Sequence, residues 1–235
     1  MQIIKGKTAI ITGGTKGIGY GVAEAMIAEG MNVAITGRNA DTVAEAAQKL
    51  GNQCLGLVAD VRDYDAQIKA VNDTVAKFGA VDAMIANAGV GHFASIEDMS
   101  VEQWNQIIDV NLTGVFYSTK ASLDALKKSQ GYLITIASLA GTNFFAKGSA
   151  YNASKFGLVG FSQAVMMDVR DQGIKVSTIM PGSVSTYFNN RVPDDTESWK
   201  IQPEDIGKLV IDLLTMHPRT LPSKVEVRPA MPAKK

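Results

Sequence analysis

The chain has 235 residues, with 23 basic and 23 acidic side chains, so its formal net charge is zero at pH 7. A neutral chain has no long-range field to hold a polyanion, which argues against nucleic acid as its main partner. Its single cysteine excludes an intrachain disulfide framework. Its two histidines lie far apart without metal-ligand spacing, so no metal site is expected.

The hydropathy of the sequence bears on the cellular location of the protein. No apolar run approaches the roughly 20 residues that span a bilayer. The first strand pattern begins within seven residues of the N-terminus and leaves no room for a signal peptide. We therefore expect a soluble, cytoplasmic protein with no membrane partner. With 46% hydrophobic and 20% charged residues, a chain of this length suits one domain, residues 1–235.

Short apolar runs alternate with helical patterns along the chain. The expected strands are residues 8–12, 32–36, 54–59, 81–86, 132–137, 175–180 and 224–228. The expected helices are residues 17–29, 41–50, 64–78, 101–128, 151–172 and 203–216. The strands are continuous apolar runs, which indicates burial on both faces of a parallel sheet. This pattern predicts an α/β fold: a Rossmann-type, doubly wound parallel sheet with helices on both faces.

The first expected strand runs into a glycine-rich turn, residues 12–19, in which the next helix begins. Glycines there allow a tight turn and a close approach to a pyrophosphate, and the helix N-terminus aims free N–H groups at the anion. Such a turn can also be purely structural, and its glycine spacing differs from Gly-x-Gly-x-x-Gly. The strand–turn–helix context favours a dinucleotide-binding site.

The end of the second expected strand indicates which dinucleotide binds. NAD sites place an acidic residue near this position, whereas NADP sites use an arginine. Here the strand is followed by Gly37 and Arg38, with no acid before Asp41. Arg38 can bind a 2′-phosphate through two hydrogen bonds, and Lys16 can add a second positive charge. The competing interpretation is that both are solvated surface charges. We expect NADP(H) rather than NAD(H).

A serine, a tyrosine and a lysine carry the expected reaction. Ser138 directly follows the fifth expected strand, at the sheet edge where open α/β folds bind ligands. Tyr151 and Lys155 have i, i+4 spacing and share a helix face. A nearby ammonium stabilises a phenolate and lowers its pKa, so Tyr151 is expected to exchange protons with a carbonyl or alcohol oxygen. On spacing alone, an exposed pair on a helix is the commoner explanation.

Taken in order, these motifs resemble the short-chain dehydrogenase/reductase family along almost the whole chain. The resemblance rests on residues 12–19, 60–61, 87–89, 111, 138, 151–155 and 181–186. It implies that Tyr151 is the general acid/base and that Ser138 positions the substrate carbonyl. It also implies that Lys155 tunes Tyr151 and holds the nicotinamide ribose. By the same resemblance, Asn111 supports a water that links Lys155 to bulk solvent.

The resemblance further implies a set of cofactor contacts. Asp60 and Val61 would meet the adenine, and Val184 and Thr186 the nicotinamide carboxamide. The full expected cofactor-binding set is Gly13, Thr15, Lys16, Gly17, Ile18, Gly19, Arg38, Asp60, Val61, Asn87, Ala88, Gly89, Tyr151, Lys155, Pro181, Gly182, Val184 and Thr186.

Two segments depart from the pattern of 3-oxoacyl-carrier-protein reductases in this family. Those enzymes usually end in a strand with a Gly-Gly pair, whereas residues 221–229 here look more like sepiapterin- and serine-type dehydrogenases. Residues 183–202 are expected to form a short, polar substrate lid, and residues 230–235 a loose tail. The aromatic side chains Tyr187, Phe188 and Trp199 could serve the lid or only its local packing.

Three further side chains could either line a substrate pocket or have no part in it. Phe144 and Phe145 follow Ser138 closely and could line a substrate pocket or pack inside the protein. His92 could reach the pocket mouth, although a surface imidazole is the commoner outcome.

Two classes of function fit this sequence. One is an NADP(H)-dependent oxidoreductase that interconverts a carbonyl and a secondary alcohol on a small molecule, with 3-oxoacyl-carrier-protein reductase as an alternative within enzymes. The other is a non-catalytic dinucleotide sensor on the same fold. A sensor has no need of Asn111, Ser138, Tyr151 and Lys155 together, so the enzyme is favoured.

The helix over residues 151–172 predicts self-association. Its apolar residues between Phe156 and Val169 point around the whole helix, although a helix on a sheet needs only one apolar stripe. An adjoining strip is expected on the preceding helix, formed by Leu112, Val115, Phe116, Thr119, Leu123 and Leu126. Two-fold pairing of these helices would cover both, and the resemblance implies the same arrangement. A homodimer and a homotetramer are both open.

Overall fold

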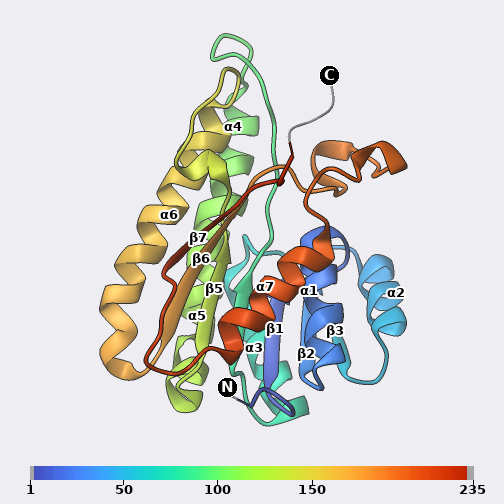
Figure 1. Cartoon of the computed structure of the whole chain (residues 1–235), viewed down its shortest axis with the longest axis vertical. Helices are drawn as coiled ribbons and strands as arrows, with labels where there is room; N and C mark the ends of the chain where they lie inside the picture. Colours follow the sequence, from blue (N-terminus) through green and yellow to red (C-terminus); the bar gives the residue numbers. More distant parts are fainter. Residues whose placement is uncertain (1–2, 232–235) are drawn as a thin grey trace.

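Seven strands form one sheet, in the order β3-β2-β1-β4-β5-β6-β7, in the computed structural model, which describes residues 3–231 (Figure 1). The strands are β1 (Thr8–Thr12), β2 (Asn32–Gly37), β3 (Cys54–Val58), β4 (Ala83–Ala86), β5 (Tyr132–Ile136), β6 (Lys175–Pro181) and β7 (Lys224–Val227). Every neighbouring pair is parallel. The predicted parallel, doubly wound α/β fold is confirmed.

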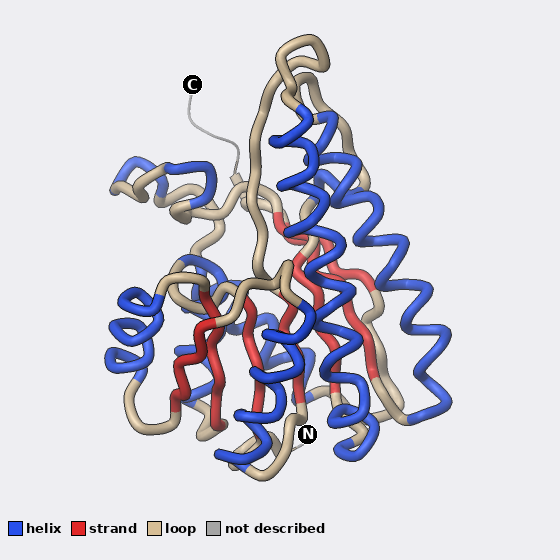
Figure 2. The backbone as a smooth tube through the Cα atoms, turned by 180° about the vertical axis from the view of Figure 1, so that it is seen from behind, coloured by secondary structure: helices blue, strands red, loops and turns tan. Residues whose placement is uncertain are grey.

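Helices cover both faces of this sheet (Figures 1 and 2). They are α1 (Gly17–Ala28), α2 (Ala40–Leu50), α3 (Tyr64–Phe78), α4 (Val101–Ile108), α5 (Gly114–Ser129), α6 (Ser149–Val169) and α7 (Pro203–Thr215). Helices α1, α2 and α7 share one hydrophobic core with the sheet, and α3, α5 and α6 share another.

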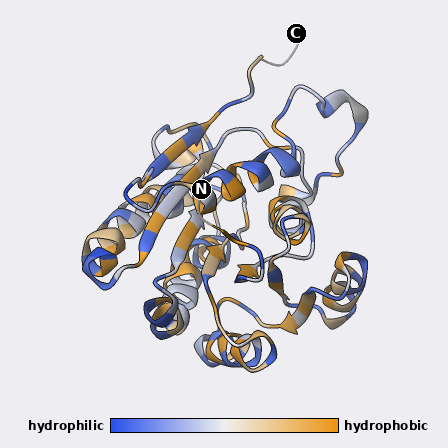
Figure 3. Ribbon diagram, turned by 60° about the horizontal axis from the view of Figure 1, so that its bottom comes forward, coloured by the Kyte–Doolittle hydropathy of each residue, from blue (hydrophilic) through white to orange (hydrophobic). Residues whose placement is uncertain are grey.

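Consecutive strand residues supply these two cores. Ile11 of β1 packs in the core that contains Met26 of α1, and its neighbour Ile10 packs in the core that contains Leu126 of α5. Successive side chains of a strand point to opposite faces, and both faces are buried here. This explains the runs of apolar residues in the central strands, whereas the helices carry both apolar and polar sides, as the hydropathy colours of Figure 3 show.

Helix α2 illustrates how the sequence sets helix ends and faces. The side chain of Asn39 accepts a hydrogen bond from the backbone N–H of Thr42, which caps the first turn. Val43, Ala46 and Leu50 are the buried residues of this helix, at the spacing of one helical stripe. Gly51 follows with a φ of +83°, a conformation that ends a helix and favours glycine.

The long helix expected over residues 101–128 is interrupted. A π-helical turn, Asp109–Thr113, separates α4 from α5. Such turns insert an extra residue into an α-helix and often occur at functional sites. The insertion has no periodic signature in the sequence, and it contains Asn111, one of the expected site residues.

The order of the strands places the site. The chain runs outward from β1 through β2 to β3, and then returns to lay β4 on the other side of β1. The loops that follow β1 and β4 therefore leave the sheet in opposite directions and open a crevice at its carboxyl end. Ligands of doubly wound folds bind at such a switch point.

Within residues 3–231, none of the helices has the length and apolar character needed to cross a bilayer. The same residues include no group of three or more histidine, cysteine, aspartate or glutamate side chains arranged to hold a metal ion.

The outer side of α5 and α6 carries fewer exposed apolar residues than expected. Val115, Thr119 and Leu126 of α5 are buried within the chain's own core, because α5 packs closely on the sheet and on α3. Phe116 and Phe156 nevertheless remain 46% and 43% exposed. The ring of Phe116 meets that of Phe161 edge-on, with centroids 6.4 Å apart. An apolar patch thus crosses from α5 to α6.

Candidate active site

A cleft of about 1280 Å³ lies at the carboxyl end of the sheet. The loops after all seven strands contribute to its lining. Every residue of the expected catalytic and cofactor-binding sets lines this cleft except Gly19 and Asn111, which lie beneath its surface. The fold therefore gathers into one site residues that are far apart in the chain.

Asn87 joins the two loops at the switch point. Its Nδ2 donates to the carbonyl oxygens of Thr12 and Gly13, at 2.9 and 3.1 Å. The hydroxyl of Thr12 in turn accepts from the backbone N–H groups of Asn87 and Ala88, at 3.0 and 3.1 Å. Thr12 belongs to the glycine-rich motif, residues 12–19, but was not among the expected site residues. These four bonds fix the glycine turn against the loop after β4.

The glycines of this turn are required by conformation and by space. Gly13 and Gly17 have φ values of +65° and +59°, which other residues rarely adopt. A Cβ at Gly19 would lie 2.5 Å from the carbonyl oxygen of Gly13 and from Nδ2 of Asn87. Gly19 thus supports the site by close packing. The backbone of residues 13–18 is left at the cleft wall, where helix α1 begins.

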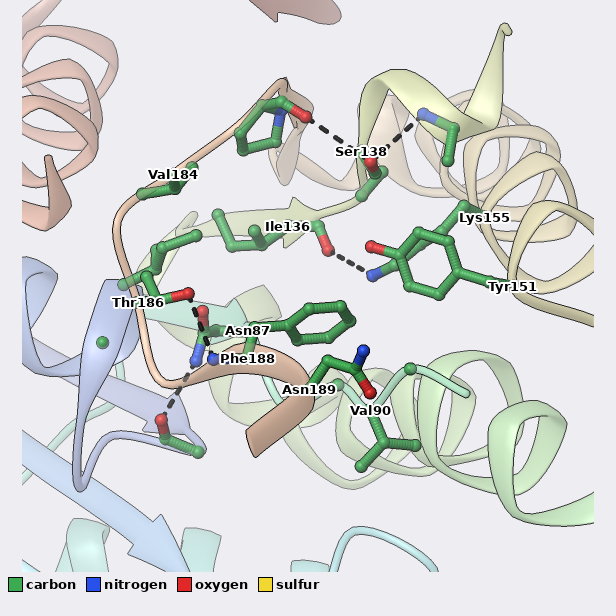
Figure 4. A pocket seen from close by; sticks show the side chains of 18 of the residues that line it. Asn87, Val90, Ile136, Ser138, Tyr151, Lys155, Val184, Thr186, Phe188 and Asn189 are labelled. Atoms are coloured by element: carbon green, nitrogen blue, oxygen red, sulfur yellow. Dashed lines mark hydrogen bonds between the residues drawn. The ribbon is translucent and has the colours of Figure 1, made fainter. Parts of the chain in front are cut away.

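Ser138, Tyr151 and Lys155 meet at the other end of the cleft (Figure 4). Ser138 Oγ accepts from the backbone N–H of Ala140 at 3.1 Å and donates to the carbonyl oxygen of Pro181 at 3.5 Å. Lys155 Nζ donates to the carbonyl oxygen of Ile136 at 3.0 Å. It also lies 5.8 Å from the centre of the Tyr151 ring. Strand β5 and helix α6 thus hold a hydroxyl, a phenol and an amine together.

Burial sets the proton affinities of this group. Lys155 is 4% exposed, and desolvation lowers its pKa from 10.5 to about 8. Tyr151 is 8% exposed, and burial raises its pKa, while a hydrogen bond from Ser138 acts in the lowering direction. The expected lowering of the Tyr151 pKa is therefore wrong, because desolvation of the phenolate dominates. Tyr151 holds its proton more tightly than a free phenol does.

Asn111 has a different setting from the other site residues. Its side chain is completely buried in the π-helical turn. Oδ1 accepts from the backbone N–H of Val90 at 2.8 Å, and Nδ2 donates to Val90 O at 2.9 Å and to Ser154 Oγ at 3.1 Å. Asn111 thereby ties the loop after β4 to helix α6, one residue before Lys155. The side chain holds the loop in place from below the cleft.

Charged groups gather at the cleft end near β2 and β3. Arg62 grips the carboxylate of Asp60, with its Nη2 2.6 Å from Oδ2. This contact, with a weaker effect of Arg38, lowers the pKa of Asp60. Arg38 is exposed and lines the cleft. The role of Arg62 was missed from the sequence, since only its position two residues after Asp60 hinted at it.

The segment 183–202 runs along the cleft. Its ends are joined by a bridge between Val184 and Ile201. Tyr187, Phe188 and Trp199 all line the cleft. Lys16 Nζ lies 5.4 Å from the centre of the Tyr187 ring, so this segment touches the glycine turn.

Other side chains from the open set also reach the cleft. Phe144 and Phe145 line it and are 86% and 48% exposed, so neither is a core residue. His92 is partly buried at the wall, and its Nε2 lies 3.0 Å from Oε1 of Gln106.

The expected loose tail, residues 230–235, falls mostly outside the described residues, since 232–235 are not among them. Its first two residues, Ala230 and Met231, line the cleft together with Arg228 and Pro229. The segment that follows β7 thus lines part of the cleft, which the sequence did not predict.

Comparison with known proteins agrees with this geometry. The sequence profile of short chain dehydrogenases matches residues 7–197. An uncharacterized oxidoreductase of Staphylococcus aureus is 32% identical, over 97% of this chain and all of that protein. The 3-oxoacyl-[acyl-carrier-protein] reductase of Salmonella typhimurium is 35% identical, over 87% of this chain and 84% of that protein.

A solved structure shows the same fold. It is an alcohol dehydrogenase from the archaeon Thermococcus sibiricus, complexed with 5-hydroxy-NADP. It matches with a TM-score of 0.90 and 27% identity, over 97% of this chain and 99% of that one. The chain belongs to the short-chain dehydrogenase/reductase family and is an oxidoreductase of that family.

The burial of Lys155 leads to a stability prediction. We expect Lys155→Met to unfold at higher urea than the wild type at pH 7, with a gain of roughly 1–3 kcal/mol, because one pKa unit is worth about 1.4 kcal/mol. The folded pKa, about 8, lies below the ordinary 10.5. The unfolded chain therefore holds more protons between these values, and the wild type gains stability as pH rises through them.

Urea unfolding at pH 7 and near pH 9.5 should show the advantage of Lys155→Met shrinking with pH. The control is Lys77→Met, which replaces an exposed lysine of α3 and should show no such trend. A Lys155→Met variant less stable than the wild type at pH 7 would contradict the desolvation of the ammonium.

Proposed function

We propose that the chain is an NADP(H)-dependent oxidoreductase that interconverts a carbonyl and a secondary alcohol on a small molecule. The observation that carries the proposal is the convergence of Ser138, Tyr151 and Lys155 at one end of a cleft whose other end is a glycine turn. A dinucleotide sensor has no use for a buried phenol and amine, whose desolvation destabilises the fold. The catalytic constellation therefore favours the enzyme over the sensor.

The cleft suits a dinucleotide in its own right. The glycine turn exposes the backbone of residues 13–18 and the start of α1 to the cleft, where free N–H groups favour a pyrophosphate. Asp60 and Val61 would hold the adenine end, and Val184 and Thr186 the nicotinamide end. When bound, NADPH supplies the hydride that the carbonyl carbon receives.

The proton comes from this chain. Tyr151 Oη would donate its proton to the substrate's carbonyl oxygen, which becomes the hydroxyl oxygen of the alcohol. Ser138 Oγ donates a hydrogen bond to the same oxygen and fixes its position. Lys155, whose pKa is about 8, can return a proton toward Tyr151 near neutral pH. A phenol with a raised pKa keeps its proton at neutral pH, which suits carbonyl reduction.

Electrostatics supports NADP(H) over NAD(H). The strand β2 ends at Gly37, followed by the exposed Arg38 at the cleft. Arg62 already pairs with Asp60, the acid of this region, and so reduces its repulsion of a 2′-phosphate. Lys16 contacts the ring of Tyr187 instead of standing free, so Arg38 carries the larger part of this preference. The Thermococcus sibiricus relative, complexed with 5-hydroxy-NADP, adds support.

A second candidate within the same chemistry is reduction of a 3-oxoacyl group on acyl carrier protein. The 35% identity to the Salmonella typhimurium reductase favours it. The C-terminal segment argues against it, because residues 228–231 turn into the cleft and lack the Gly-Gly pair. That segment resembles sepiapterin- and serine-type dehydrogenases more closely.

We also propose that the protein is a homodimer or homotetramer joined through α5 and α6. The exposed rings of Phe116 and Phe156 support this, because apolar patches that cross two helices are typical of interfaces. The neighbouring Gly160 leaves open space above its Cα, where a second helix can approach closely.

Replacing the phenol tests the acid. We expect Tyr151→Phe to lower turnover by ~100-fold or more, because a positioned acid contributes at least that much. The dissociation constant of NADPH, measured by fluorescence, should stay within about twofold of the wild type, since the ring is kept. An NADPH-oxidation assay over ketones and aldehydes measures the loss. Activity within about tenfold of the wild type would remove Tyr151 from this role.

Replacing Arg38 tests the cofactor preference. We expect kcat/KM to be at least about tenfold higher with NADPH than with NADH, and Arg38→Ala to remove most of this ratio, because a hydrogen bond to a charged group contributes ~1.5–3 kcal/mol. The value for NADH should hardly change. The control is Arg170→Ala, an exposed arginine beyond α6. An unchanged ratio in Arg38→Ala would refute the assignment.

The interface is tested by mass. Light scattering coupled to size-exclusion chromatography should give two or four times the chain mass of 25.0 kDa. Phe116→Glu combined with Phe156→Glu should shift the protein toward 25.0 kDa, because the charges cannot be buried against a second copy. Ile3→Glu, at an 80% exposed position near the N-terminus, is the control. A wild-type protein that runs as a 25.0 kDa species would overturn the proposal.

A further inference from the structure

Three phenylalanine rings from three separate loops gather beside Tyr151. Phe93 follows β4, Phe145 precedes α6, and Phe188 belongs to the segment 183–202. The centroids of Phe93 and Phe188 lie 5.5 and 5.6 Å from that of Tyr151. Phe145 lies 5.7 Å from Phe93. We call Phe93, Phe145 and Phe188 the aromatic wall.

The backbone makes room for this wall. A Cβ at Gly91 would lie 2.6 Å from the ring of Phe188 and 3.3 Å from that of Phe93. A Cβ at Gly148 would lie 2.6 Å from the ring of Phe145. Larger residues at these two positions would push the rings away, so the glycines allow the rings to pack where they do.

A buried amide fixes one part of the wall to the reaction site. Asn152, the residue after Tyr151, is 8% exposed. Its Nδ2 donates to the carbonyl oxygens of Ala140 and Asn143, both at 2.7 Å, and its Oδ1 accepts from the backbone N–H of Phe145 at 3.4 Å. The loop that carries Phe145 is therefore tied to the start of α6. Phe145 keeps its position relative to Tyr151.

The wall faces the cleft. All three rings line it, and Phe93 and Phe145 are 39% and 48% exposed. Figure 4 shows Phe188 pointing into the space beside Tyr151 and Lys155. Apolar rings left open beside a reacting group favour a ligand that covers them with apolar surface. Their centroid spacing is that of edge-to-face and offset aromatic packing, which a ligand ring can extend.

We propose that the aromatic wall is the substrate-binding surface and that the substrate class is an aryl ketone or aryl aldehyde, or the corresponding benzylic alcohol. The inference rests on the proposed carbonyl chemistry at Tyr151. A carbonyl oxygen at Tyr151 Oη brings one of its flanking groups against rings that themselves touch Tyr151. A linear thioester chain has no ring to pack there and gains less from the wall.

The test compares matched ketones in an NADPH-oxidation assay. We expect kcat/KM for acetophenone to exceed that for butan-2-one and that for acetoacetyl-coenzyme A by at least about tenfold. Phe93→Leu and Phe145→Leu should each lower the value for acetophenone by roughly 2- to 10-fold, the range of one aromatic contact. The ratio of the value for acetophenone to that for butan-2-one should therefore fall, because the smaller ketone has no ring to pack on the wall. Ile96→Ala, at a 75% exposed position in the loop of Phe93 and outside the cleft lining, is the control.

Two results overturn the inference while leaving the proposed function intact. One is a wild-type enzyme whose kcat/KM for butan-2-one or for the thioester equals its kcat/KM for acetophenone. The other is an acetophenone preference that survives in both leucine variants.

A binding measurement separates this inference from the proposed function. Calorimetry on Tyr151→Phe in the presence of NADPH measures the binding of acetophenone to the aromatic wall without turnover. Saturable binding that Phe145→Leu weakens supports the wall even if no carbonyl is reduced, whereas absence of binding refutes it. Reduction of no carbonyl by a wild type that binds acetophenone would count against the proposed function alone.

Discussion

The hydrogen bonds between Asn87 and the backbone of Thr12 and Gly13 are the contacts on which the site depends. They cross the point where the strand order reverses, so they hold two loops that would otherwise diverge. Gly19 fits beneath them only because it has no Cβ. The glycine turn owes its exposed backbone to this packing. The same hydrogen bonds fix the start of the loop after β4. Further along this loop, Val90 is hydrogen-bonded to Asn111 and Phe93 lines the cleft.

A second constraint is the burial of two groups that water would solvate better. Helix α6 holds Lys155 and Tyr151 in a low-dielectric setting. Burial lowers the pKa of Lys155 and raises that of Tyr151, so both shifts favour the neutral forms. The sequence suggested that the lysine would dominate the tyrosine. In the fold, desolvation is the largest cause of the shift in the pKa of Tyr151, because the phenol is buried, and it exceeds the lowering by the hydrogen bond from Ser138. Burial thus brings the pKa of the amine to about 8 and favours the protonated phenol. The cost is a lower folding stability.

Periodic features were predictable from the sequence, and singular ones were not. Strands and helices alternate along the chain, each with its own hydrophobic period, so the parallel sheet and the strand ends that carry Ser138, Arg38 and Asn87 followed from pattern. The π-helical turn around Asn111 adds one residue without any periodic trace. The aromatic wall comes from three loops, and loops have no periodicity to place their side chains. The strip expected on α5 was too wide, because residues such as Val115 are buried by neighbours that periodicity alone does not reveal.

The segment 183–202 links the two ends of the cleft. Tyr187 lies under Lys16 of the glycine turn, and Phe188 packs against Tyr151 at the opposite end. A cation–π contact at an exposed site contributes only ~0.5–1 kcal/mol, and an aromatic pair ~0.5–1.5 kcal/mol. Contacts of this size hold the segment against both ends of the cleft. Phe188 therefore stays beside Tyr151, and a ligand ring that packs on it would extend a contact of the same kind. A small polar ligand has no apolar surface with which to cover these rings.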